Sequence, residues 1–202
     1  DEINLSDSLD LVLGVRFDSI DYDVDDVYNS TVLTDSDDTV SPKVGLIFSA
    51  TDQLALYASY SETFSPLKGD QYASLGTNYD KMDPLSYENS EAGFRYDFGG
   101  LSFSASYFEL NSNKPAYDPD EVPMYSVSEQ EITGFELQLV GNVTDRWFVS
   151  AGYTNLDAEK ANGDRLRETP EDVFSIWNNF LVSDSLAVNL GIINQGKSHI
   201  KD

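Results

Sequence analysis

"PKVGLIFSATDQLALYASYSETF", residues Pro42 to Phe64, contains two runs in which every second residue is apolar, at 44–48 and 54–60. Alternation with a period of two predicts a β-strand that has one apolar and one polar face. Only a short polar stretch separates the two runs, so the sequence predicts an antiparallel hairpin here. The solvent that its apolar face meets depends on the rest of the chain.

The same alternation recurs along the chain and predicts nine strands. The nine runs cover residues 9–17, 44–48, 54–60, 92–98, 101–107, 135–139, 147–153, 173–180 and 186–192. Residues 1–5 resemble the stub of another strand, and helical spacing with capping residues is nowhere competitive. The predicted fold class is therefore all-β, with an antiparallel, up-and-down order of strands.

The connections between the runs alternate strictly between short and long. Short turns lie at 50–53, 99–100, 142–146 and 183–185, and long polar connections lie at 20–39, 62–86, 111–130 and 155–172. Connections of about 20 residues are unusual in compact soluble domains. A transmembrane β-barrel, in contrast, places tight turns on the periplasmic side and long loops outside. The asymmetry therefore favours a transmembrane barrel.

Aromatic residues at the strand ends support this interpretation. Phe48, Phe98, Trp147 and Phe180 lie beside short turns, and Phe17, Tyr60, Tyr107 and Tyr153 lie near long connections. Two such girdles mark the two membrane–water interfaces of a barrel. The polar face is rich in Gly and Ser and carries charges of both signs, which suits a wet or plugged lumen. The alternative is a soluble antiparallel sandwich whose polar face meets water.

The composition excludes several other classes of protein. The 202 residues include 36 acidic and 12 basic side chains, for a net charge of −24, which argues against a nucleic-acid partner. The absence of Cys excludes a disulfide framework and thiolate metal sites. Single-chain bacterial barrels have even numbers of strands, so nine runs and a stub suggest an excised segment of a larger barrel.

Four stretches, taken in order, resemble one known family. They are SPKVGLIFSATDQLALYASYSETFSP, DPLSYENSEAGFRYDF, ITGFELQLVGNVTDRWFVSAGYTNLDAE and RLRETPEDVFSIWNNF. Together they cover most of the chain, and the family is the TonB-dependent outer-membrane receptors of the ferric-siderophore type. The resemblance implies that residues 1–202 are the C-terminal part of a β-barrel of about 22 strands, without its plug domain and terminal strands.

The same resemblance implies a function and its partners. Such receptors lie in the bacterial outer membrane, bind a ferric siderophore from outside and import it with energy from the TonB complex. No covalently bound cofactor and no enzymatic activity are expected, and the sequence contains no catalytic motif. The alternatives are a receptor for another solute, such as a glycan or cobalamin, and a soluble β-rich Ca²⁺-binding or adhesion module.

The long connections supply candidate ligand contacts, because they carry flat aromatic and amide groups. The candidates are Phe64, Gln71, Tyr72, Tyr79, Tyr117 and Tyr125. Such groups suit a bulky, partly apolar chelate that is rich in oxygen acceptors. The alternative is that these side chains only pack the loops.

The acidic stretch DYDVDD offers the carboxylates of Asp21, Asp23 and Asp25 as weak candidates for a Ca²⁺ site. It lacks the Gly and the distal Glu of an EF-hand loop, so a solvated acidic loop is the simpler interpretation. Acidic outer loops also suggest contact with anionic lipopolysaccharide of the outer membrane through bridging divalent cations. His199 has no second His or Cys to complete a metal site.

Overall fold

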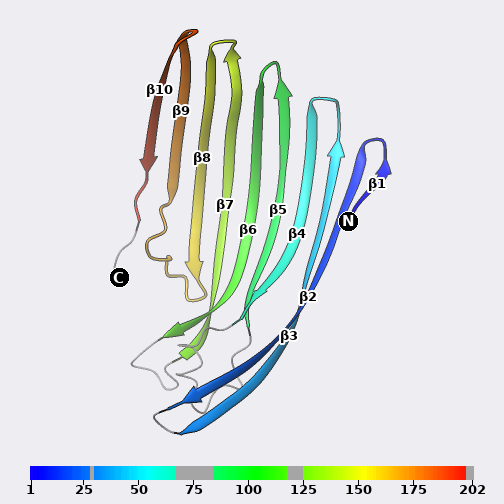
Figure 1. The fold of residues 1–202 in the computed structure, drawn as a ribbon, viewed down its shortest axis with the longest axis vertical. Coiled ribbons are helices and arrows are strands. Elements are labelled where there is room, and N and C mark those ends of the chain that lie inside the picture. Colours follow the sequence, from blue (N-terminus) through cyan, green and yellow to red (C-terminus); the bar gives the residue numbers. More distant parts are fainter. Residues whose placement is uncertain (28–29, 67–83, 118–124, 199–202) are drawn as a thin grey trace.

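Ten antiparallel strands in sequence order form a single sheet over the part of the chain that the structure describes (Figure 1). The computed structural model describes residues 1–27, 30–66, 84–117 and 125–198. The strands are β1 (Glu2–Ser6), β2 (Leu9–Asp26), β3 (Thr31–Ser49), β4 (Leu54–Ser65), β5 (Leu85–Phe98), β6 (Leu101–Tyr117), β7 (Tyr125–Thr144), β8 (Trp147–Lys160), β9 (Asp172–Ser183) and β10 (Leu186–Gln195). No helix in these ranges is long and apolar enough to cross a membrane.

The hairpin predicted from the opening stretch is confirmed as β3–β4. Val44 lies opposite Tyr60, so the apolar residues of the two strands share one face. The turn closes with a 2.8 Å hydrogen bond from the Ala50 N–H to the Leu54 carbonyl oxygen. Thr51 Oγ1 accepts the Leu54 N–H at 3.0 Å. A hydroxyl that hydrogen-bonds nearby backbone in this way stabilises a tight turn.

All nine predicted runs form strands, and the predicted stub is β1. All four predicted long connections are longer than the observed ones. The difference is largest where the β2–β3 ladder continues to Asp26 and Thr31 and the β6–β7 ladder to Tyr117 and Tyr125. In the outer part of β2 the apolar alternation changes face, because Ile20 and Tyr22 follow an odd-numbered run that ends at Phe17. The prediction ended the strand at this change of face, whereas the backbone ladder continues through it.

The apolar face of the sheet is exposed rather than packed into a core. Among the described residues, the buried hydrophobic side chains are Val149 and Ala158, whereas Val15 is 61% and Ile192 is 64% exposed. A soluble sandwich would cover such a face with a second sheet. The described strands form one layer (Figure 1), which is the form of a barrel wall whose apolar face meets lipid.

Aromatic side chains pair near both ends of this lipid-facing surface. Beside the short turns, the rings of Trp147 and Phe180 stack with their centroids 5.5 Å apart. Trp147 Nε1 donates to Asn178 Oδ1 at 3.0 Å. Towards the long connections, the ring centroids of Phe135 and Tyr153 are 5.7 Å apart. Rings with a hydrogen-bonded polar atom suit the membrane–water interface, as the predicted girdles require.

On the opposite, lumen-facing side, three aromatic rings lie over glycines of the neighbouring strand. The register pairs are Tyr57 with Gly93, Phe108 with Gly134, and Trp177 with Gly191. A Cβ at Gly93 would lie 2.9 Å from the Tyr57 ring and 2.6 Å from the Ala105 carbonyl oxygen. Real Cβ atoms essentially never come this close. The Tyr57 ring can therefore lie over this strand only because Gly93 has no side chain.

We predict that Gly93→Ala destabilises the intact barrel, whereas Gly14→Ala does not. The methyl group at position 93 would overpack against a ring and a carbonyl, which costs about 1–3 kcal/mol. At Gly14 a Cβ would have its nearest neighbour, Lys43 Cβ, at an ordinary 3.6 Å. Alanine there is expected to change stability by less than about 1 kcal/mol. Urea unfolding in detergent micelles measures both variants, and equal losses would contradict the steric role of Gly93.

Candidate functional site

The lumen-facing side is the first candidate surface, because the polar side chains of the wall lie on it and the opposite side is apolar. Ion pairs between residues two apart on one strand lie along it. Arg16 Nε is 2.7 Å from Asp18 Oδ2, and Arg95 Nε is 3.1 Å from Asp97 Oδ1. All four side chains are partly exposed, so the pairs add little to stability. They do place charges of both signs on this surface.

A polar cavity of about 330 Å³ lies on this surface across β4 to β8. The Tyr57 hydroxyl donates a hydrogen bond to Glu91 Oε1 at its edge. Ser106, Glu136 and Thr154 also line it. The two carboxylates and the hydroxyls in this lining can accept hydrogen bonds. The cavity therefore suits a cation with several N–H donors.

Phe64 lies half-buried near the outer end of β4 and lines a cavity of about 630 Å³. The cavity exists because β3 leaves β4 beyond the pair Lys43–Ser61 and continues outward with β2. Its lining also includes four carboxylates, which are Asp37, Asp38, Glu62 and Glu88. Side chains alternate along a strand, so Phe64 shares the side of Tyr60, which is the lipid-facing side lower down.

The other predicted ligand contacts are placed only in part. The backbones of Tyr117 and Tyr125 lie directly opposite each other at the outer ends of β6 and β7. The structure thus brings these two positions together. Gln71, Tyr72 and Tyr79 lie outside the described residues.

The three candidate Ca²⁺ ligands lie along a strand rather than around a loop. Asp21, Asp23 and Asp25 are exposed on one side of β2. Their partners across the ladder are Ser36, Thr34 and Val32. Among the described residues, no group of three or more His, Asp or Glu side chains is arranged to hold a metal ion. The Ca²⁺ site stays a prediction without a ligand set in this part of the chain.

A row of four acidic residues and one asparagine crosses the outer ends of five strands, from β4 to β8, on the side that faces lipid lower down. Successive register pairs join Glu62, Glu88, Asn111, Glu131 and Glu159. Glu62 follows the girdle residue Tyr60 by two positions, so the row begins just outside the aromatic girdle. Like charges directly opposite each other on a sheet are destabilising. The row, named here the carboxylate row, therefore attracts cations.

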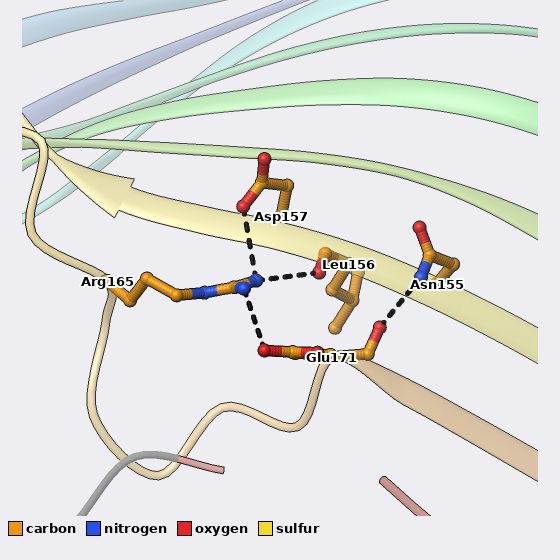
Figure 2. A network of polar contacts seen from close by, with 5 residues as sticks. All are labelled: Asn155, Leu156, Asp157, Arg165 and Glu171. Atoms are coloured by element: carbon orange, nitrogen blue, oxygen red, sulfur yellow. Dashed lines mark hydrogen bonds and ion pairs between the residues drawn. The ribbon is translucent and has the colours of Figure 1, made fainter. Parts of the chain in front are cut away.

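The connection from β8 to β9 carries an ion-pair network (Figure 2). Arg165 Nη1 donates to Glu171 Oε1 at 2.8 Å, and its Nη2 donates to Asp157 Oδ1 at 3.1 Å. The same Nη2 lies 3.4 Å from the Leu156 carbonyl oxygen. Asn155 Nδ2 donates to the Glu171 carbonyl oxygen at 3.1 Å. One guanidinium group thus joins the end of β8 to the residue before β9.

Sequence reasoning missed both this network and the Tyr57–Glu91 hydrogen bond. Tyr57 and Glu91 are 34 positions apart and meet only through the register of β4 with β5. For Arg165, the available signal was a basic residue in an acidic connection, six positions before Glu171. That signal does not reveal which carboxylates the arginine contacts.

The family described as TonB dependent receptor-like, beta-barrel matches residues 1–198. The chain is 26% identical to the probable TonB-dependent siderophore receptor PiuA of Acinetobacter baumannii, over 98% of this chain and 30% of that protein. It is 28% identical to the ferripyoverdine receptor of Pseudomonas aeruginosa, over 96% of this chain and 25% of that protein. The chain therefore spans less than a third of the length of these relatives.

The solved structures agree in fold. The ferripyoverdine receptor of the outer membrane of Pseudomonas aeruginosa, bound to ferripyoverdine, matches with a TM-score of 0.79 and 25% identity. The match covers 98% of this chain and 27% of that chain. The all-β, partial-barrel fold and the outer-membrane location predicted from the sequence are confirmed. Because the family match extends over nearly all of its residues, the chain belongs to the TonB-dependent receptor-like β-barrel family.

Proposed function

We propose that the intact receptor captures a ferric siderophore outside the cell and imports it with energy supplied through TonB. The observation that carries the proposal is a barrel wall with an exposed apolar face and a polar, cavity-bearing lumen face. A path for a polar solute across a membrane needs this arrangement. The solute class is taken from the relatives, which are named as siderophore receptors.

In this proposal the chain supplies part of the wall and of the outer rim. The plug domain, and through it the TonB complex, belongs to the rest of the receptor. The carboxylates of Glu91 and Glu136 line the lumen cavity, where they would accept hydrogen bonds from basic side chains of the plug. The ferric siderophore is cargo rather than a bound cofactor, and we propose no covalent chemistry for this chain.

The proposed ligand contacts are the aromatic and amide side chains of the outer connections. They are Phe64, Gln71, Tyr72, Tyr79, Tyr117 and Tyr125. Phe64 has the most support, because it lines a cavity at the outer end of the wall. The carboxylates in that lining disfavour an anionic group and favour a chelate that carries ammonium or guanidinium groups.

The purified intact receptor is expected to bind ferripyoverdine more tightly than a ferric catecholate, whose catecholate groups leave a net negative charge around the iron, and to bind neither cobalamin nor an oligosaccharide. Trp177 is 52% exposed on the lumen side, so quenching of its fluorescence reports a ferric chelate in the lumen. A Trp177→Phe variant identifies the share of the signal that comes from this residue. If the receptor bound only cobalamin or only the oligosaccharide, the proposed solute class would be wrong.

Phe64→Ala is expected to weaken binding of the ferric siderophore about tenfold. A ring in contact with a flat ligand contributes about 1–1.5 kcal/mol, which corresponds to this factor. The matched control is Phe98→Ala, because Phe98 stacks on Tyr96 at the short-turn end of β5, far from the outer rim. Fluorescence titration measures both affinities. Equal affinities for the two variants would show that Phe64 does not contact the ligand.

We further propose that the carboxylate row meets the phosphate-bearing head groups of lipopolysaccharide through Mg²⁺ or Ca²⁺. The row lies just outside the aromatic girdle, where head groups begin, and its opposed like charges need counter-ions. Hard divalent cations prefer such carboxylate and phosphate oxygens.

In bilayers that contain lipopolysaccharide, EDTA is expected to lower the melting temperature of the intact receptor. The double variant Glu131→Gln, Glu159→Gln should lose most of this effect, because amides do not hold the bridging cations. Asp52→Asn, in the short turn after β3, is the control and should keep the effect. An identical response to EDTA in all three proteins, or in bilayers without lipopolysaccharide, would argue against the bridge.

A further inference from the structure

The segment between β8 and β9 folds back along β8 before β9 begins. The Leu166 N–H donates to the Ala158 carbonyl oxygen at 2.8 Å, and Arg165 forms an antiparallel bridge with Glu159. The ladder then resumes where the Leu156 N–H donates to the Glu171 carbonyl oxygen at 2.8 Å. Residues 167–170 leave the sheet between these two points. We call residues 167–170 the excursion.

Arg165 closes the base of the excursion (Figure 2). Its guanidinium group lies between Asp157 on β8 and Glu171 at the start of β9, at 3.1 and 2.8 Å. The Arg165 side chain is 34% exposed, so its charge is only partly screened by water. A planar guanidinium group can hold two carboxylates and a carbonyl at once, which an ammonium group does less well.

Glu171 links the base of the excursion to a third segment. Its side chain binds Arg165, and its carbonyl oxygen accepts hydrogen bonds from Leu156 N–H and Asn155 Nδ2. Its own N–H donates to the Lys197 carbonyl oxygen, just after β10, at 3.0 Å. The end of β8, the excursion and the segment after β10 therefore meet at one residue.

The backbone of the excursion is strained. Glu168 has a φ of +59°, a conformation that non-glycine residues other than Asn and Asp seldom adopt. Such a residue persists only where the surrounding contacts impose it. The Thr169 hydroxyl donates to the Arg167 carbonyl oxygen at 3.3 Å across the strained residue. A strained tip above a closed base indicates a shape that is held without any ligand.

The geometry points to Arg165 as a positioning residue that keeps this part of the outer rim preformed for the capture of a ferric chelate. The role in capture rests on the proposed function. The preformed shape of the rim rests on the contacts of Arg165. A rim that is already ordered does not lose conformational freedom when the chelate arrives. Loosening it lowers the fraction of receptors that are competent to bind, and apparent affinity falls by the same fraction.

The test uses the intact receptor in detergent with the variants Arg165→Gln and Arg165→Lys. The control is Arg146→Gln, which removes an exposed ion pair to Asp184 at a short turn, 3.3 Å long and with a 96% exposed partner. Hydrogen exchange of residues 155–171 is expected to be about tenfold faster in Arg165→Gln, intermediate in Arg165→Lys and unchanged in the control. Equal exchange in Arg165→Gln and Arg146→Gln would overturn the inference.

Binding kinetics separate positioning from direct contact. With ferripyoverdine or a ferric catecholate as the probe, Arg165→Gln should slow association in proportion to the fall in the competent fraction and leave dissociation unchanged. Faster dissociation with unchanged exchange would make Arg165 a ligand contact and overturn the positioning role. If the wild-type receptor binds neither probe, the proposed function and the capture role fail, whereas the exchange comparison still decides whether Arg165 holds the rim.

Discussion

Inside a bilayer the N–H and C=O groups of a strand find no water, so each of them needs a partner on a neighbouring strand. In the described part of the chain, each strand from β1 to β10 is hydrogen-bonded to its neighbours in sequence order. Because side chains alternate along a strand, a single register places whole apolar runs on one face and polar runs on the other. The lipid surface and the lumen surface both follow from this one hydrogen-bonding requirement. The two edge strands carry the same requirement to the rest of the barrel.

On the lumen surface, aromatic rings pack against the backbone of neighbouring strands. Bare glycines let the rings of Tyr57, Phe108 and Trp177 lie over the neighbouring strand. A ring that lies against the wall leaves more of the lumen free than one that points across it. The Tyr57 ring also carries its hydroxyl to Glu91, so packing and the polar chemistry of the lumen depend on the same glycine, Gly93.

Outside the membrane the ladders continue, but the forces on the side chains differ. Acidic residues replace apolar ones on the outward side, which gives the carboxylate row and the acidic cavity beside Phe64. A surface with this excess of negative charge attracts cations and repels anionic chelates over a Debye length. Within this surface, Arg165 is a cation whose guanidinium group is engaged by Asp157 and Glu171. Its role is therefore to shape the rim, and the charge that a chelate meets there is mainly negative.

By itself, the sequence determined the membrane class through the asymmetry between short turns and long connections, because a transmembrane barrel places tight turns at one end and long loops at the other. The alternation of apolar residues determined the strands and their two faces. The hairpin at Pro42 to Phe64 shows this, since its predicted pairing is the observed one. The length of the strands beyond the membrane was decided only in the tertiary structure, because backbone pairing continues there through the change of face in β2. The same holds for the meeting of Tyr57 with Glu91 and for the carboxylates that Arg165 binds, since cross-strand register and a folded-back connection bring these groups together.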